Sequence, residues 1–181
     1  MRIIGGKYRS RVLAEFGGKD VRPTADRTKE SLFNILSTKI IGARVLDLFT
    51  GSGNLGLESL SRGAKEVVFN DISRESLAIV KKNLAALKIP VNGEEAMVYN
   101  YDYSVCLDAV QSCFDIIFLD PPYALEIGRT ILEKIVKNNL LNENGIIVYE
   151  CDKPITEDTD GLARYDERRY GKAYLTFFRK A

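Results

Sequence analysis

The first residues with chemically informative spacing form a glycine turn. Residues 45–60, VLDLFTGSGNLGLESL, place Gly51, Gly53 and Gly56 in a G-x-G-x-x-G pattern between an apolar run and an expected helix. Glycines allow the backbone to approach a ligand closely, and the start of the helix offers free amides. Asp71 follows Gly51 by 20 residues, which is where the ribose-binding acid lies in dinucleotide-binding proteins.

An acid before this turn separates two classes of cofactor. Asp47 stands four residues before the first glycine, where a carboxylate is costly to bury without hydrogen-bond donors. It would repel the pyrophosphate of a dinucleotide, but it would suit the ammonium and sulfonium charges of S-adenosylmethionine. We therefore favour S-adenosylmethionine as the cofactor. Because Asp71 would bind ribose in either case, an NAD oxidoreductase is kept as a distant alternative.

A second chemical group follows another apolar run. The segment FDIIFLDPPY ends in Asp120, Pro121, Pro122 and Tyr123, and ligands contact such strand ends in open α/β sheets. The Asp120 carboxylate and the Pro121 carbonyl could accept hydrogen bonds from an exocyclic base amine and favour a pyramidal nitrogen. Tyr123 could stack on the base and align it with a methyl group. The simpler structural explanation is a proline-rich turn leaving a strand.

Residues for several other chemistries are missing from the sequence. The chain has no histidine, which excludes a histidine general base. Its three cysteines, Cys106, Cys113 and Cys151, form no C-x-x-C pair and are expected to be reduced thiols in a cytoplasmic protein. No metal site is expected.

Charge is unevenly distributed although the net charge is only +1. Residues 1–30 and residues 164–181 each carry a net charge of +4, so the middle of the chain is acidic. Basic ends of this kind indicate contact with a polyanion, but solvated surface charge explains the same counts.

These residues must be positioned by alternating strands and helices. Strands are expected over residues 44–49, 66–70, 95–100, 114–120 and 145–151, and helices over 54–62, 74–87, 104–112 and 126–138. The strands are rich in Val, Ile and Phe, as in a helix-covered parallel sheet. Residues 162–170 and 172–180 are expected to form an antiparallel pair around Gly171. The predicted fold is a doubly wound, mostly parallel seven-stranded α/β sheet of Rossmann-like type.

The N-terminal part is expected to form a small extension to this sheet. Residues 2–6 and 10–16 resemble two short strands of a basic β-hairpin. Pro23 is expected to stop regular structure, and Asp26 to cap a helix over residues 27–36. We predict one methyltransferase domain over 1–181, with an N-terminal extension at 1–26 and a catalytic core at 27–181. No secretory signal or membrane span is expected.

The motifs together resemble a known family. A D-P-P-Y tetrapeptide after the fourth strand is similar to the signature of S-adenosylmethionine-dependent amino-methyltransferases. RIIGGKYRSR, RPTADRTKESLFNIL, ARVLDLFTGSGNLGLESLSRGA and FDIIFLDPPY, in this order, resemble the bacterial 16S rRNA guanine-N2 methyltransferases of the RsmD type. The resemblance covers residues 2 to about 150. It departs from the family pattern at Thr50, where Ala is commoner, and at Asp71, where Glu is commoner.

The resemblance implies roles for individual residues. Asp120, Pro121, Pro122 and Tyr123 would receive guanine 966 of 16S rRNA. The residues implied for S-adenosylmethionine are Asp47, Phe49, Gly51, Ser52, Gly53, Asp71, Ile72, Asp102 and Thr24. The residues implied for RNA are Arg2, Lys7, Arg9, Arg11, Arg22 and Arg27, with Lys19 as a further candidate.

The implied partner is 16S rRNA, in the small ribosomal subunit or an assembly intermediate, and the protein is expected to act as a cytoplasmic monomer. A base must be unstacked to reach such a pocket, which favours a loop nucleotide of RNA. Other acceptors stay open: adenine N6 in DNA or RNA, or a protein glutamine. A binding protein without turnover, an RNA scaffold, is the alternative from another class.

Overall fold

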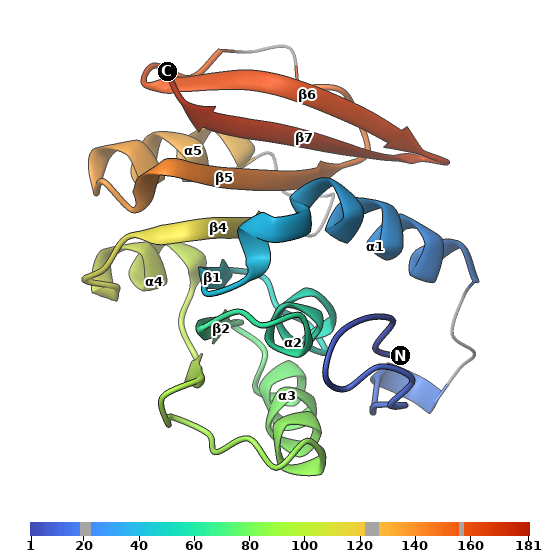
Figure 1. Ribbon diagram of the computed structural model, residues 1–181. Helices are drawn as coiled ribbons and strands as arrows, with labels where there is room; N and C mark the ends of the chain where they lie inside the picture. The colour runs from blue at the N-terminus through green and yellow to red at the C-terminus, as the bar shows by residue number, and fades with distance from the viewer. Residues whose placement is uncertain (19–22, 122–126, 156–157) are drawn as a thin grey trace.

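The computed structural model describes residues 1–18, 23–121, 127–155 and 158–181. Its strands form one seven-stranded sheet in the order β3-β2-β1-β4-β5-β7-β6 (Figure 1). The strands are β1 Arg44–Asp47, β2 Glu66–Asn70, β3 Ala96–Tyr99, β4 Phe114–Leu119, β5 Leu141–Cys151, β6 Leu162–Tyr170 and β7 Ala173–Lys180. The α-helices are α1 Pro23–Leu36, α2 Asn54–Ser61, α3 Arg74–Ala86, α4 Tyr103–Ala109 and α5 Gly128–Lys137.

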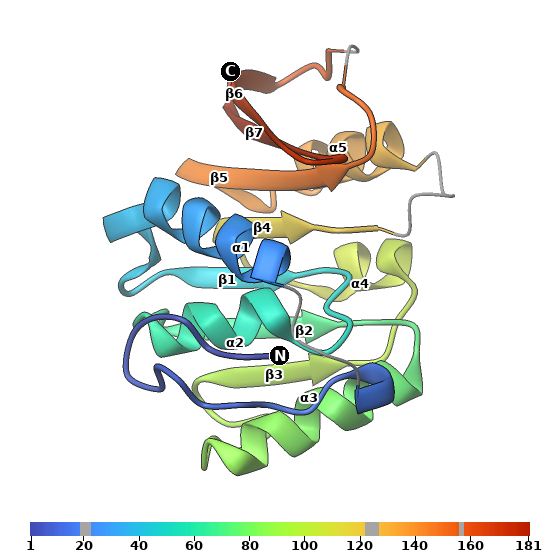
Figure 2. The same cartoon turned by 90° about the vertical axis from the view of Figure 1, so that its right-hand side faces the viewer.

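The predicted fold class is confirmed. β3, β2, β1, β4 and β5 are parallel, whereas β7 pairs antiparallel with both β5 and β6. In Figure 2 the arrowheads of β2, β4 and β5 point the same way. The C-terminal ends of the parallel strands therefore meet at one edge of the sheet, where open α/β sheets bind ligands.

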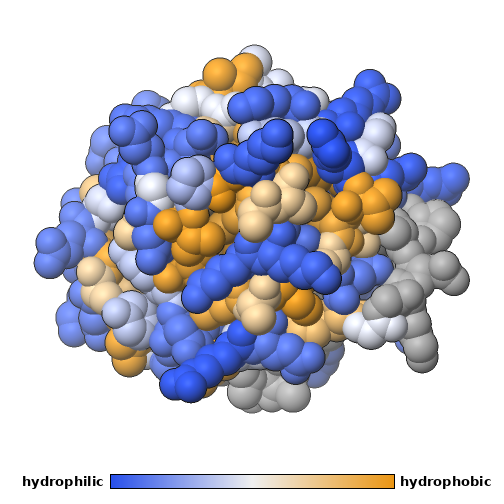
Figure 3. Space-filling view, turned by 90° about the horizontal axis from the view of Figure 1, so that it is seen from below, coloured by the Kyte–Doolittle hydropathy of each residue, from blue (hydrophilic) through white to orange (hydrophobic). Residues whose placement is uncertain are grey.

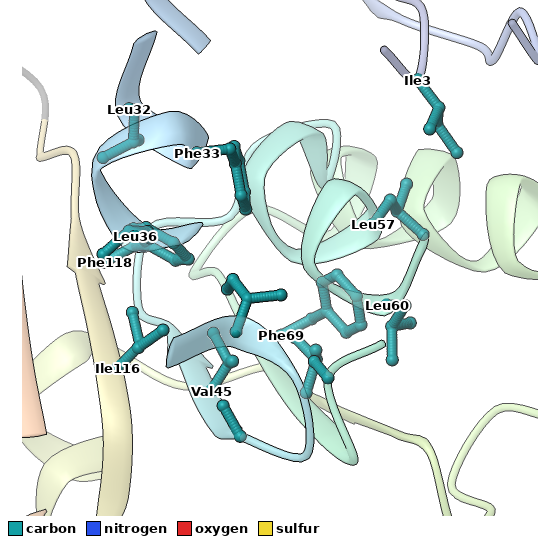
Figure 4. Close-up of a cluster of buried hydrophobic side chains, with 14 of the residues drawn as sticks. Ile3, Leu32, Phe33, Leu36, Val45, Leu57, Leu60, Phe69, Ile116 and Phe118 are labelled. Atoms are coloured by element: carbon teal, nitrogen blue, oxygen red, sulfur yellow. The ribbon is translucent and has the colours of Figure 1, made fainter. Parts of the chain in front are cut away.

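Helices cover both faces of the sheet. α1, α2 and α3 lie on one face, and α4 and α5 lie on the other (Figure 1). On the first face Phe33, Val45, Leu57, Phe69 and Phe118 belong to a buried cluster (Figure 4). On the second face a separate cluster packs strand residues such as Leu46 and Ile117 against Ile131 of α5. Alternate strand residues thus fill two cores, which explains the nearly continuous apolar runs in the sequence.

The N-terminal segment is less regular than a hairpin. Residues 2 and 12 form one isolated antiparallel bridge, and the Ile3 amide donates to the Arg11 carbonyl at 3.0 Å. Ile3 is 1% exposed and joins the core beside α2. The two segments pair antiparallel as expected, but they form a loop anchored to the core, without two regular strands.

The start of α1 differs from the expectation. The helix begins at Pro23, whereas Pro23 was expected to stop regular structure and Asp26 to cap the helix. A proline needs no amide partner in the first helical position and its fixed φ suits the helix there. Asp26 lies inside the helix, where its Oδ2 accepts from the Arg2 guanidinium at 2.8 Å.

The outer surface on the α3 side of the molecule is mixed, with long hydrophilic side chains interleaved with apolar ones (Figure 3). Over the described ranges, no helix is both long enough and apolar enough to span a membrane.

Candidate active site

Two adjoining cavities open at the C-terminal edge of the parallel strands. The larger cavity, of about 620 Å³, is lined in part by Gly51, Asp71, Ile72, Asp102 and Tyr103. The smaller cavity, of about 420 Å³, is lined in part by Thr28, Lys29, Asp47, Asn54, Tyr170 and Lys172. Phe49, Asp120 and Glu150 line both cavities. The residues after β1 and the residue after β4 therefore meet around one continuous space.

The glycine turn between β1 and α2 requires its glycines for different reasons. Gly51 and Gly53 have φ values of +52° and +86°, a region that side chains disfavour. A Cβ on Gly56 would lie only 2.3 Å from Cε1 of Phe69, so this glycine allows α2 to pack closely on β2. Around Gly51 a Cβ would meet open space, which leaves the backbone accessible from the larger cavity.

Asp47 is a buried support of this turn. Its side chain is 3% exposed, and its Oδ2 accepts from the Thr50 hydroxyl at 2.8 Å and from the Gly56 amide at 3.0 Å. Burial raises the pKa of Asp47 to about 6, although both hydrogen bonds act in the opposite direction. The carboxylate thus ties the end of β1 to the start of α2 while bordering the smaller cavity.

Asp71 supports the same turn from β2. Its Oδ2 accepts from the Gly51 amide at 2.9 Å, and its Oδ1 accepts from the Ser73 amide at 2.8 Å. Each carboxylate oxygen has two lone-pair sites, so acceptor capacity is left for hydroxyls of a ligand.

The other lining residues of the larger cavity include an acid, Asp102, and several apolar side chains. Asp102 caps α4, where its Oδ1 accepts from the Ser104 amide at 2.9 Å. Ile72 is 71% exposed and borders the cavity. The rings of Phe49 and Tyr103 lie 6.0 Å apart. Carboxylates beside flat apolar surfaces suit a nucleoside, because hydroxyls and ring amines need acceptors while the ring faces need apolar contact.

Asp120 lies where the two cavities join. It is an exposed residue facing their open space. Desolvation in this recess, with the negative charges of Glu150 and Asp47, raises the pKa of Asp120 to about 8. The next residue, Pro121, is buried and lines the larger cavity. A carboxyl with this pKa is poised between its two protonation states near neutral pH.

The smaller cavity also has cationic groups. Lys29 of α1 is 3% exposed, and its Nζ donates to the Asn54 side chain at 2.8 Å and pairs with Glu58 at 3.3 Å. Burial lowers the pKa of Lys29, although Glu58 opposes this shift. Lys172, in the turn between β6 and β7, is exposed at the same cavity.

Some of the residues expected to bind S-adenosylmethionine do not line either cavity. Ser52 and Gly53 belong to the turn itself, and the Ser52 carbonyl accepts from the Asn83 side chain at 3.2 Å. Thr24 lies in the first turn of α1, where the structure describes its backbone but not its side chain. Lys19, Arg22, Pro122 and Tyr123 also lie outside the described residues.

The expected RNA-binding side chains are spread along the N-terminal segment. Arg2 pairs with Asp26, whereas Lys7 is anchored through its amide to the Ser61 carbonyl at 2.6 Å, at the C-terminal end of α2. Because α2 starts at the cavities, Lys7 lies at the end of that helix remote from them. The expected RNA-binding residues with exposed side chains are Arg2, Lys7, Arg9, Arg11 and Arg27.

Sequence reasoning missed Lys29, Tyr103, Glu150, Tyr170 and Lys172. Glu150 could have been found, because it is an acid one residue before the end of the expected strand 145–151, much as Asp120 is an acid at the end of the expected strand 114–120. Lys29 and Lys172 carry no local motif, and only the tertiary fold brings them to the cavity. Within the described part of the chain, no group of three or more His, Cys, Asp or Glu side chains is arranged so that it could hold a metal ion.

Known proteins resemble this chain along nearly its whole length. Ribosomal RNA small subunit methyltransferase D of Haemophilus influenzae is 38% identical over 178 residues, covering 91% of each chain. The solved structure "Putative methyltransferase yhhF" from Escherichia coli superposes with a TM-score of 0.86 at 30% identity, covering 99% of this chain and 97% of that one.

A third similarity concerns the fold alone. The 16S rRNA N2 methyltransferase RsmC of Thermus thermophilus, in complex with AdoMet and guanosine, has a TM-score of 0.71 at 22% identity. The match covers 92% of this chain and 45% of that chain.

The sheet, its glycine turn and these similarities define a methyltransferase of the Rossmann-like α/β class. Within that class, the chain belongs to the family described as Conserved hypothetical protein 95, the RsmD-type methyltransferases, which matches residues 1–179.

Proposed function

We propose that this protein transfers a methyl group from S-adenosylmethionine to the exocyclic N2 amine of a guanine in 16S rRNA. The observation that carries the proposal is the position of Asp120, at the junction of the two cavities. The larger cavity would hold the donor and the smaller cavity would admit the base. Asp120 would then lie beside both reacting groups.

The larger cavity fits S-adenosylmethionine by its residues. Asp71 would accept from ribose hydroxyls, Ile72 and Tyr103 would contact the adenine, and Asp102 would accept from the adenine amine. The open backbone at Gly51 leaves room for a close approach. Asp47 would attract the positive end of the donor from the adjoining cavity. When bound, S-adenosylmethionine supplies an electrophilic methyl carbon on a sulfonium.

The residues after β4 would hold the acceptor amine. The Asp120 carboxylate and the Pro121 carbonyl would each accept one N–H hydrogen bond from the guanine N2. These bonds align the nitrogen lone pair with the methyl carbon, so the enzyme acts mainly by orientation. As the nitrogen–carbon bond forms and the carbon–sulfur bond breaks, the amine loses one proton. A carboxylate with a raised pKa is suited to receive that proton.

The proposed partner is 16S rRNA within the small ribosomal subunit or an assembly intermediate. The Haemophilus influenzae relative is named as a small-subunit rRNA methyltransferase, which supports such a substrate here. The RsmC structure, which is similar in fold alone, holds AdoMet together with guanosine. We propose guanine 966 as the target, from the resemblance, and a cytoplasmic monomer as the working form. The exposed cations of the N-terminal segment would contact RNA phosphates around the target.

A labelling experiment tests this function. The protein is incubated with methyl-labelled S-adenosylmethionine and, separately, with small subunits lacking the modification, naked 16S rRNA, DNA and a protein extract. We expect N2-methylguanosine in one of the rRNA samples after digestion to nucleosides. Labelled N6-methyladenosine or methylglutamine would identify the other acceptors, and no label in any sample would favour a binding protein without turnover.

A further inference from the structure

Three acidic residues at the ends of neighbouring strands line the smaller cavity: Asp47, Asp120 and Glu150. Asp47 ends β1 opposite Phe118, and Glu150 of β5 is paired with Leu175 of β7. Phe118 and Leu175 belong to the core cluster beneath α1. Since alternate residues of a strand point to opposite faces, Asp47, Asp120 and Glu150 all face the α1 side of the sheet.

Asp120 and Glu150 form a neighbouring pair at this edge. Leu119 of β4 lies opposite Tyr149 of β5, so the next residues along these parallel strands are Asp120 and Glu150. Their negative charges interact, which contributes to the raised pKa of Asp120. A ligand that brings two adjacent hydrogen-bond donors to this pair would relieve the repulsion between the two charges.

Guanine and adenine differ in whether they can bring two adjacent hydrogen-bond donors to Asp120 and Glu150. The Watson–Crick edge of guanine presents the N1–H donor next to the N2 amine. The corresponding edge of adenine presents one amine next to the bare N1, which is an acceptor. A carboxylate facing a bare N1 would leave two acceptors opposed in a partly enclosed site, which is unfavourable.

We propose that Glu150 is a specificity-determining residue that accepts the N1–H of the target guanine while Asp120 holds the N2 amine. This assignment rests on the proposed function and specifies the base edge that the smaller cavity recognises. Glu150 transfers no proton in this role, and no bond to it forms or breaks. Its contribution is to distinguish guanine from purines whose N1 carries no hydrogen.

A positive charge at the smaller cavity, that of Lys172, agrees with this orientation of the nucleotide. Lys172 is exposed in the β6–β7 turn and borders the same cavity as the carboxylates. A nucleotide whose base edge meets Asp120 and Glu150 would direct its phosphate away from them, toward a cation. The lining of this cavity therefore combines acids that could read a base edge with a cation that could contact a phosphate.

The test exchanges the target base and Glu150 in a two-by-two comparison. Small subunits are reconstituted with 16S rRNA carrying either guanine or 2-aminopurine at the nucleotide found by labelling. 2-Aminopurine keeps the exocyclic amine but has an acceptor at N1. Initial rates of methyl transfer are measured for the wild type, Glu150→Gln, Glu150→Asp and the control Glu143→Gln. Glu143 is an exposed residue that pairs with Lys180.

We expect the wild type to prefer guanine by about 100-fold or more. Gln can donate to a bare N1, so Glu150→Gln should narrow this preference at least tenfold, whereas Glu150→Asp and Glu143→Gln should keep it. Comparing ratios cancels the intrinsic difference between the two amines. Calorimetric titration with S-adenosylmethionine checks that the Gln variant still binds the donor.

The failures of the two proposals are distinguishable. If the wild type methylates neither base, the proposed function is wrong. If it methylates guanine and Glu150→Gln keeps the full preference, the role of Glu150 is overturned. If Glu150→Gln no longer binds S-adenosylmethionine, Glu150 belongs to the binding site of the methyl donor. This result would also overturn its role in base recognition. If Glu150→Gln melts below the assay temperature, the wild type alone tests the proposal. Equal rates of methyl transfer to guanine and 2-aminopurine by the wild type would then overturn the role of Glu150.

Discussion

Asp120 is the residue on which the chemistry depends. It is neither in a core nor freely solvated, because it follows β4 at the junction of two cavities and lies near two further acids. Removing the charge of Asp120 should leave the proposed S-adenosylmethionine site in the larger cavity intact. Gly51, Asp71 and Asp102 of that site are held by hydrogen bonds that do not involve Asp120.

Replacement of Asp120 by Asn should separate binding from turnover. We expect Asp120→Asn to lower methyl transfer at least 100-fold, because the amide is a weaker acceptor and cannot take up the amine proton. Donor affinity, measured by calorimetry, should change by less than about threefold. Asp108→Asn, on an exposed acid of α4 that pairs with Lys134, is the matched control. Full turnover in Asp120→Asn would contradict the amine-holding role.

The raised pKa of Asp120 also predicts how stability depends on pH. The folded-state pKa of about 8 lies above the ordinary value of 3.8, so between these values the folded protein binds more protons than the unfolded chain. Stability attributable to this group is therefore present at low pH and falls as the pH rises toward 8. Asp120→Asn lacks the effect, so its melting temperature relative to wild type should be higher at pH 8.5 than at pH 5. An equal difference at both pH values, measured by calorimetry, would contradict the raised pKa.

Among the elements, α2 joins the site to the N-terminal segment. Glu58 of α2 is fully buried and accepts from the amides of Ile4 and Gly5, both at 2.9 Å. It also pairs with Lys29 of α1 and with Arg62 one turn later. This one carboxylate therefore fixes three segments, including the helix that supplies Lys29 to the smaller cavity.

Two glutamates provide a matched test of this connection. Glu58–Arg62 and Glu133–Arg129 are both i,i+4 pairs at 2.7 Å, but the first is buried and the second exposed. Glu58→Ala should lower the free energy of unfolding by about 3–5 kcal/mol, because it leaves Lys29 as an uncompensated buried charge. Glu133→Ala should cost less than about 1 kcal/mol. Urea unfolding measures both, and equal losses would contradict the anchoring role.

The elements were largely predictable because their patterns are local. Apolar runs and the glycine turn placed the strands and α2, since a parallel sheet buries both faces. The start of α1 and the N-terminal pairing were not predictable. Proline is typical both of helix breaks and of the first helical position, so the sequence did not decide where α1 begins. Because the helix starts at Pro23, Asp26 lies inside its first turn and does not cap it.

Segments that lie far apart in the sequence converge on the smaller cavity. α1 contributes Lys29, the start of α2 contributes Asn54, and the β6–β7 turn contributes Lys172. Asp47, Asp71 and Asp120 were accessible to sequence reasoning because each ends or follows a strand. Lys29, Tyr170 and Lys172 were not, because long-range packing alone brings them to the site.

The β6–β7 turn gives a prediction for RNA binding. Lys172→Ala should weaken binding to small subunits and lower the salt dependence of the affinity, by a slope of about 0.7–0.9 if one phosphate contact is lost. Lys65→Ala is the control, because Lys65 is also exposed but precedes β2 at the opposite end of the strands. Filter binding over a range of salt concentrations measures both, and identical slopes would remove the turn from the interface.

The proposal that Asp120 holds the guanine amine beside the methyl donor is tested most sharply by a crystal structure with a non-reactive analogue of S-adenosylmethionine and guanosine monophosphate bound together. We expect the analogue in the larger cavity and guanine in the smaller one, with its N2 within hydrogen-bond reach of Asp120 and about 3–3.5 Å from the position of the transferred carbon. A guanine that binds outside the smaller cavity, or that turns its N2 away from Asp120, would contradict it.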